Sequence, residues 1–250
     1  MIKKPKLAII SLTSCEGCQF ALMDLGQEFL AVVKNFELAE FRLLEEKQLE
    51  NKYFDIALLE GNPITAKNLE LLKAVRAKAK ILIALGNCAD MGGVWAIRNY
   101  LKNFDPAKYV YKNQPADIAK RVEKISNIIK PDYVLYGCPI NAKDFVILLT
   151  SLANGQKPEI IERTVCFECQ TNGYKCLLME HEICLGPITR GGCEAVCLKS
   201  KQACWGCRGL VDKPNCQNLF KELKKYHSED SINKTMEVFG LREEVEENLP

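Results

Sequence analysis

The residues with the most evident chemistry in this chain are its thirteen cysteines. Four of them are spread over the first 150 residues, and the other nine lie between residues 166 and 216. Thiolates are ligands of zinc and of iron–sulfur clusters, and they also form redox-active pairs. A chain of 250 residues with 48% apolar residues can build a core without the help of disulfides. The clustering of the cysteines therefore predicts metal binding rather than a disulfide framework.

The first 155 residues alternate between apolar segments typical of strands and longer segments typical of helices. Strands are predicted at residues 7–12, 38–44, 55–61, 81–87 and 132–137. Helices are predicted at residues 18–33, 64–79, 93–103, 115–129 and 142–153. Apolar strands separated by helices are typical of a parallel sheet covered on both faces. We therefore expect residues 1–155 to form a flavodoxin-like, doubly wound α/β domain.

Each of the four early cysteines follows the carboxyl end of a predicted strand. A CxxC pair comes after the first strand, and single cysteines come after the fourth and fifth strands. In an open α/β sheet these strand ends share one edge, and ligands bind there. The sequence therefore predicts a single four-thiolate site at this edge. Its members, the first cysteine group, are Cys15, Cys18, Cys88 and Cys138.

A four-thiolate site suits either structural zinc or an iron–sulfur cluster. Structural zinc usually staples small domains that lack a core, and its ligands commonly come as two close pairs. Here one pair and two single cysteines lie on a domain that has a core. Glycines flank the edge and would let backbone N–H groups approach a bulky cofactor. An iron–sulfur cluster is therefore favoured, and a zinc-stapled binding scaffold is the alternative.

Residues 156–250 carry the remaining nine cysteines and few recognisable helices or strands. The first eight divide in chain order into two groups of four. The second cysteine group is Cys166, Cys169, Cys176 and Cys184, and the third is Cys193, Cys197, Cys204 and Cys207. A segment of this kind owes much of its order to its metals. We therefore expect a loop-rich domain with two iron–sulfur clusters and a C-terminal tail, in which Cys216 is a free thiol.

Charge and hydropathy argue against several functions. The formal net charge is only +2, so there is no basic field to attract nucleic acid. No apolar run is long enough to span a membrane. The apolar stretch near the N-terminus is too short for a signal peptide, and a cysteine pair follows it at once. We therefore expect a cytoplasmic chain whose thiols stay reduced.

Taken together, the cysteine motifs resemble those of the small subunits of NiFe-hydrogenases. The resemblance rests on the CxxC pair, on GNCADMGG at residues 86–93, on GCP at residues 137–139 and on CLGPITRGGC at residues 184–193. It extends over roughly residues 10–210, which is nearly the whole chain. It is greatest to the soluble branch, which includes sulfhydrogenase delta subunits and the small subunits of deazaflavin-reducing and non-reducing hydrogenases.

The resemblance implies three 4Fe–4S clusters that relay electrons for a hydrogenase. The first cysteine group would hold the proximal cluster, the second group the distal cluster and the third group the medial cluster. The medial cluster of periplasmic relatives often lacks a fourth cysteine ligand, and Cys197 supplies one here. The partners implied are a large subunit with the NiFe centre and a further electron-acceptor subunit with flavin, iron–sulfur clusters or both. The chain itself would carry no NiFe centre.

Some positions depart from the family pattern. Ile140 stands where a second proline usually follows GCP. The related subunit of respiratory complex I has adjacent cysteines in place of the first pair and no two-cluster tail. An iron–sulfur subunit of a related non-hydrogenase oxidoreductase is a further alternative. Glu16 and Glu60 are candidates for functional contacts at the thiol edge, and we expect LREEVEENLP, residues 241–250, to be a solvated acidic end.

Overall fold

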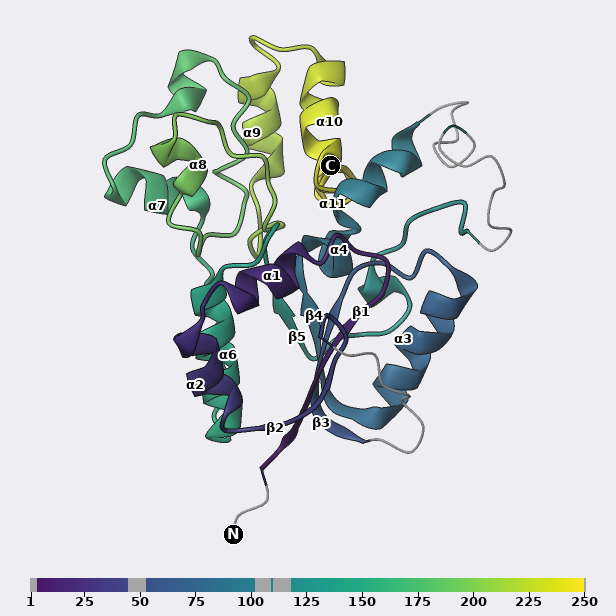
Figure 1. The fold of residues 1–250 in the computed structure, drawn as a ribbon. Coiled ribbons are helices and arrows are strands. Elements are labelled where there is room, and N and C mark those ends of the chain that lie inside the picture. Colours follow the sequence, from purple (N-terminus) through teal and green to yellow (C-terminus); the bar gives the residue numbers. More distant parts are fainter. Residues whose placement is uncertain (1–3, 45–52, 102–108, 110–117, 250) are drawn as a thin grey trace. The chain divides into compact units, whose positions relative to one another are not determined.

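The computed structural model describes residues 4–44, 53–101, 109 and 118–249 of the chain. By its internal contacts the chain divides into two compact units. The first comprises Met1–Gly92 and Arg98–Glu159, and the second comprises Gly93–Ile97 and Ile160–Pro250. The first unit is built on a sheet with helices, whereas the second consists of loops and short helices (Figure 1).

The described strands of the first unit form one five-stranded parallel sheet in the order β2-β1-β3-β4-β5. Their bounds are β1 Lys6–Ser11, β2 Glu37–Phe41, β3 Phe54–Glu60, β4 Ala79–Leu85 and β5 Tyr133–Leu135. Each of the five predicted strands overlaps one of these. This order is that of the flavodoxin-like doubly wound fold, so the predicted fold class is confirmed.

Helices cover both faces of this sheet. Figure 1 shows α1, α2 and α6 on one face and α3 on the other. The bounds are α1 Gly17–Met23, α2 Gln27–Val33, α3 Ala66–Lys78, α4 Gly86–Met91 and α6 Ala142–Ala153, with the 3-10 helix η2 Ile125–Asn127. A further 3-10 helix, η1 Gly93–Tyr100, is divided between the two units. Four of the helices come next after a strand: α1 after β1, α3 after β3, α4 after β4 and α6 after β5.

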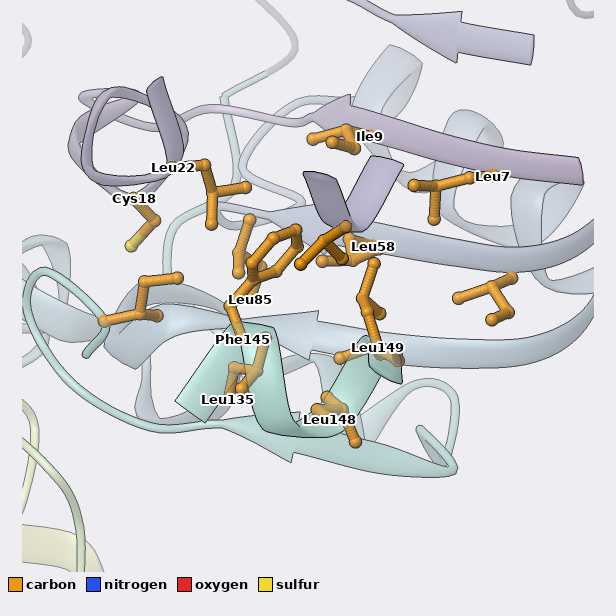
Figure 2. Close-up of a cluster of buried hydrophobic side chains, with 14 of the residues drawn as sticks. Leu7, Ile9, Cys18, Leu22, Leu58, Leu85, Leu135, Phe145, Leu148 and Leu149 are labelled. Carbon is orange, nitrogen blue, oxygen red and sulfur yellow. The ribbon is translucent and has the colours of Figure 1, made fainter. Parts of the chain in front are cut away.

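Two apolar cores lie on opposite faces of the sheet, and β1 contributes to both. Leu7 and Ile9 pack into the core beneath α1, α2 and α6, whereas Ala8 and Ile10 pack into the core beneath α3. Figure 2 shows the first core, with Phe145 of α6 over the strands. All of these side chains are fully buried. Burying a large apolar side chain stabilises a fold by about 1.5–3 kcal/mol, so both cores hold the strand ends in place.

The single helix predicted at residues 18–33 is wrong. The chain forms α1 and α2 instead, with a break before Gln27. Gly26 has a φ of 55° and a ψ of −117°, a conformation that glycine adopts far more readily than other residues. The break turns α2 so that Phe29 and Val32 reach the core. Gly26 was the signal in the sequence that marked this break.

Two further predicted helices differ from the structure. The helix predicted at residues 93–103 is the 3-10 helix η1, and its last two predicted residues lie outside the described part. The helix predicted at 115–129 is wrong over its described part, residues 118–129, which holds an isolated bridge from Ile118 to Thr65 and then η2. The side chain of Asn99 bonds both the N–H and the C=O of Val122, so this backbone is satisfied without a helix.

The second unit contains short helices joined by cysteine-bearing loops. Their bounds are α7 Val165–Thr171, η3 Leu177–Glu180, α8 Val196–Lys199, α9 Cys216–Leu223, α10 Glu229–Glu237 and α11 Arg242–Glu247. The prediction of a solvated C-terminal end is wrong, because Leu241 and Val245 are fully buried. Their spacing of four residues places both on one side of α11, and the acidic residues of this helix occupy the rest of its surface.

Candidate metal centres

The structure brings the four thiols of the first cysteine group together at the carboxyl edge of the sheet. Cys18 belongs to α1, Cys88 to α4, and Cys138 follows β5. Burial and the charge of Glu60 raise the pKa of Cys18, and the neighbouring thiols Cys88 and Cys138 raise it further. Burial, then the charge of Cys15, raise the pKa of Cys138. These electrostatic influences connect all four members of the group, as their placement after parallel strands predicts.

The CxxC pair is shaped by the residues between its cysteines. Glu16 precedes α1 with a φ of 60°, which turns the chain sharply between the two thiols. The N–H of Gly17 lies 3.4 Å from the Sγ atom of Cys15 and donates to it. A Cβ at position 17 would lie only 3.3 Å from the same sulfur. The Oε1 atom of Glu16 accepts a hydrogen bond from Ser11 at 3.1 Å, so this side chain supports the turn.

Glycine is required at a second point of the edge. Gly86 has a φ of 80°, and a Cβ there would overlap the Sγ atom of Cys18 and lie 3.3 Å from the carbonyl oxygen of Gly137. Gly137 itself has a φ of 125° and accepts a hydrogen bond from the N–H of Asn87 at 2.8 Å. The backbone thus approaches the thiols closely on two sides. The four thiols are thus surrounded by glycine backbone that has no side chains. This arrangement fits a group that is bound by thiolates and that accepts hydrogen bonds from nearby N–H groups.

A buried carboxyl lies behind the first cysteine group. Glu60 at the end of β3 is 1% exposed, and its two oxygens accept from the N–H of Cys18 at 3.2 Å and from Gln19 Nε2 at 3.0 Å. Burial raises the pKa of Glu60. Asn62 donates from Nδ2 to the carbonyl oxygen of Cys88 at 2.6 Å. The sequence pointed to Glu60 but missed Gln19 and Asn62, although the position of Asn62 just after a strand end was a usable signal.

The second cysteine group lines one small cavity in the second unit. All four of its thiols border this cavity, together with apolar side chains that include Leu177 and Leu178. Burial and the neighbouring charges of Cys176, Cys169 and Cys184 raise the pKa of Cys166. Helix α7 carries the first two cysteines and is capped by Thr164, whose Oγ1 accepts from the N–H of Phe167 at 3.2 Å. The structure therefore places these four thiols around one space.

The third cysteine group lies next to the second in this unit. Burial raises the pKa of Cys197, and the charge of Cys193 raises it further. Burial also raises the pKa of Cys204, and the charge of Cys207 adds to this increase. Cys184 of the second group acts on both Cys197 and Cys204, and its Sγ accepts from the N–H of Cys204 at 3.4 Å. The two groups of this unit are therefore neighbours, and their division into four and four stays a prediction.

The thirteenth cysteine differs from the others. Cys216 begins α9, is 1% exposed, and burial alone raises its pKa.

Within residues 4–44, 53–101, 109 and 118–249, no three cysteine, histidine or acidic side chains form a site for a single metal ion. In the same part of the chain, none of the helices is long and apolar enough to cross a membrane.

A flavodoxin-like sheet with four thiols at its ligand-binding edge, followed by a cysteine-rich unit, defines a class of iron–sulfur electron-transfer subunits. The chain belongs to the family described as NADH ubiquinone oxidoreductase, 20 Kd subunit, which matches residues 15–152. This match covers most of the first unit, including all four members of the first cysteine group.

Known proteins resemble the chain beyond this region. Sulfhydrogenase 2 subunit delta from Pyrococcus furiosus is 33% identical over 94% of this chain and 99% of its own length. A chain in the structure of an NAD+-reducing [NiFe]-hydrogenase in the H2-reduced state is 31% identical, with a TM-score of 0.56 over 63% of this chain and 96% of that one. The actinobacterial-type NiFe-hydrogenase from Ralstonia eutropha H16 shares the fold over 99% of this chain and 92% of its own, with a TM-score of 0.59 at 16% identity. The recognition of a NiFe-hydrogenase small subunit from the sequence motifs is confirmed, and the chain is a subunit of the hydrogenase class of oxidoreductases.

Proposed function

We propose that this chain is the electron-transfer subunit of a cytosolic NiFe-hydrogenase. It would relay electrons between the NiFe centre of a large subunit and a redox partner subunit that contains flavin, iron–sulfur clusters or both. The observation that carries the proposal is the convergence of four thiols and bare glycine backbone at the carboxyl edge of the sheet. The similarity to Sulfhydrogenase 2 subunit delta over 94% of the chain supports it.

The proposal assigns twelve of the cysteines as ligands of three 4Fe–4S clusters. The first group would hold the proximal cluster, the third group the medial cluster and the second group the distal cluster. When bound, such clusters supply one-electron redox couples, whose reduction potentials are about −400 mV in low-potential ferredoxins. In this proposal the reaction of H2 itself belongs to the large subunit.

The contribution of this chain is to hold the ligands and to set their electrostatic surroundings. Hydrogen bonds from the N–H of Gly17 to Cys15 and from the N–H of Cys204 to Cys184 stabilise negative charge on the sulfurs. Burial has the opposite effect, since it disfavours charged thiolates. The balance of these two effects is one way in which a protein adjusts the potentials of its clusters.

The proposal is tested by metal analysis of the complex purified without oxygen. We expect about twelve irons and as many sulfides for each copy of this chain, in addition to the iron of the NiFe centre and of any clusters in the partner subunit, with nickel in a co-purifying subunit. Zinc in place of iron, with no acid-labile sulfide, would support the zinc-stapled scaffold instead. Isolation of the chain as a stable monomer with intact clusters and no partner would contradict its role as a hydrogenase subunit.

A second function has one observation in its favour. The family that matches residues 15–152 is described by a subunit of NADH ubiquinone oxidoreductase rather than by a hydrogenase. The alternative function is that of an iron–sulfur subunit of a related oxidoreductase that does not act on H2. The nickel content of the complex decides between the two functions, because only a NiFe-hydrogenase needs nickel in its large subunit.

A further inference from the structure

The segment Gly191–Gly192 joins the second and third cysteine groups and directly precedes Cys193. It has no room for side chains. A Cβ at position 191 would lie 2.9 Å from the carbonyl oxygen of Arg163, and one at position 192 would lie 2.5 Å from a terminal guanidinium nitrogen of Arg208. Gly192 also has a φ of 105°, which disfavours other residues. The backbone of this segment is therefore packed closely against Arg163 and Arg208.

Glu168 holds the segment from the side of the second cysteine group. It stands between Cys166 and Cys169 in α7 and is 4% exposed. Its Oε1 atom accepts from the N–H of Gly192 at 2.7 Å and from Arg163 Nε at 2.8 Å. Hydrogen bonds from backbone N–H groups to a carboxylate are roughly twice as strong as neutral ones. Glu168 thereby connects the first turn of α7 to the residue before Cys193.

Arg208 holds the same segment from the side of the third cysteine group. It follows Cys207 directly and is 3% exposed. Its Nε atom donates to the carbonyl oxygen of Gly191 at 2.7 Å. One acidic and one basic side chain, each next to a cysteine, therefore bond successive residues of the segment. The N–H of Gly191 is bound as well, since it donates to the carbonyl oxygen of Arg163 at 2.7 Å.

We propose that Glu168 and Arg208 are positioning residues that fix Cys193 relative to the Cys166–Cys169 pair and to Cys207. They act through the Gly191–Gly192 segment and set the spacing between the two clusters of this unit, so the proposal rests on the function proposed above. Residues that orient metal ligands in this way commonly change affinity or activity 10–100-fold when they are replaced.

The bond to Gly192 matters more in this proposal than the ion pair with Arg163. The side chain of Arg163 is 48% exposed, and ion pairs in water contribute little to stability. The bond from Gly192 is buried, so its loss is not compensated by water. A glutamine at position 168 would keep an oxygen for this bond while losing the charge, and this difference separates the two contributions.

The test compares Glu168→Ala, Glu168→Gln and the control Glu162→Ala, a neighbouring exposed glutamate, in the complex purified without oxygen. Three properties are measured: iron and sulfide content, the magnetic interaction between reduced clusters by electron paramagnetic resonance, and hydrogen–deuterium exchange of the peptide that contains Gly192. For Glu168→Ala we expect exchange at Gly192 to be at least about tenfold faster and the interaction signal to change. Glu168→Gln keeps an accepting oxygen but loses the charge, so its exchange and interaction signal should lie between those of Glu168→Ala and the wild type, and Glu162→Ala should match the wild type.

Exchange and interaction signals in Glu168→Ala that equal those of Glu162→Ala would overturn the proposal. If Glu168→Ala loses its clusters, the result for Glu168→Gln decides between the outcomes. An interaction signal near that of the wild type in Glu168→Gln supports the positioning role, whereas a loss of the clusters in both variants overturns the proposal. A wild-type complex without iron would instead refute the proposed function. The exchange rates at Gly192 would then still show whether Glu168 holds this segment.

Discussion

Replacement of Gly86 by alanine should empty the first cysteine group of its metal and leave the other two groups filled. The new Cβ would overlap the Sγ atom of Cys18 and lie 3.3 Å from the carbonyl oxygen of Gly137. Favourable contacts of this kind lie near 3.5–4.0 Å, so the sulfur must move by on the order of 1 Å. Metal ligands have to be held within about 0.5 Å of their productive positions. The displacement therefore exceeds what a bound group tolerates.

Backbone strain is a second effect of this substitution, and a matched control removes it. Gly86 has a φ of 80°, where alanine costs about 1–2 kcal/mol. Gly155 has a φ of 67° and no atom within 4 Å of its Cβ position. Gly155→Ala in the same unit therefore introduces similar backbone strain without the overlap. Any difference between the two variants reports the contact with Cys18.

The assay is the iron and sulfide content of each variant complex after purification without oxygen. Gly86→Ala should hold about four irons fewer per copy of this chain than the wild-type complex, whereas Gly155→Ala should match the wild type. The thermal midpoint of Gly86→Ala, measured without metal, should lie below that of Gly155→Ala, because the overlap with Cys18 adds to the backbone strain that both variants share. Equal, complete iron content in both variants would refute the reasoning, since Cys18 would then not be a ligand fixed in the observed position.

Three further substitutions test other parts of the structure. The buried carboxyl of Glu60 has a raised pKa, so its protonated form contributes stability that is lost as the pH rises through that pKa. Glu60→Gln should therefore remove this decline of the thermal midpoint with pH, and parallel curves for variant and wild type would contradict it. Leu241→Ala should destabilise the chain by about 2–5 kcal/mol in urea unfolding, because Leu241 is fully buried, whereas the exposed Ile160→Ala should change little. Cys216→Ala should keep the full iron content, and a loss of iron would show that the thirteenth cysteine is a ligand.

The fold was largely predictable where a local pattern was strong. Strands buried on both faces are continuous apolar runs, and each predicted strand overlaps an observed one. The helix at Ala142–Ala153 has the predicted bounds, since it is capped by Asn141, whose side chain accepts from the N–H of Lys143. The predictions failed where distant partners satisfy the backbone. Asn99 does so at Val122, and Leu241 with Val245 make an acidic end part of a core.

The candidate sites show the same division. Residue type and order alone determined which thiols could act and that four of them follow parallel strands. The sequence could not reveal that Cys184 lies beside thiols of both later groups, that Gly86 leaves space for Cys18, or that Glu168 holds Gly192. Each of these relations joins segments far apart in the chain. Only the packing of the folded chain brings such segments within bonding distance, because local sequence patterns specify elements and not the contacts between them.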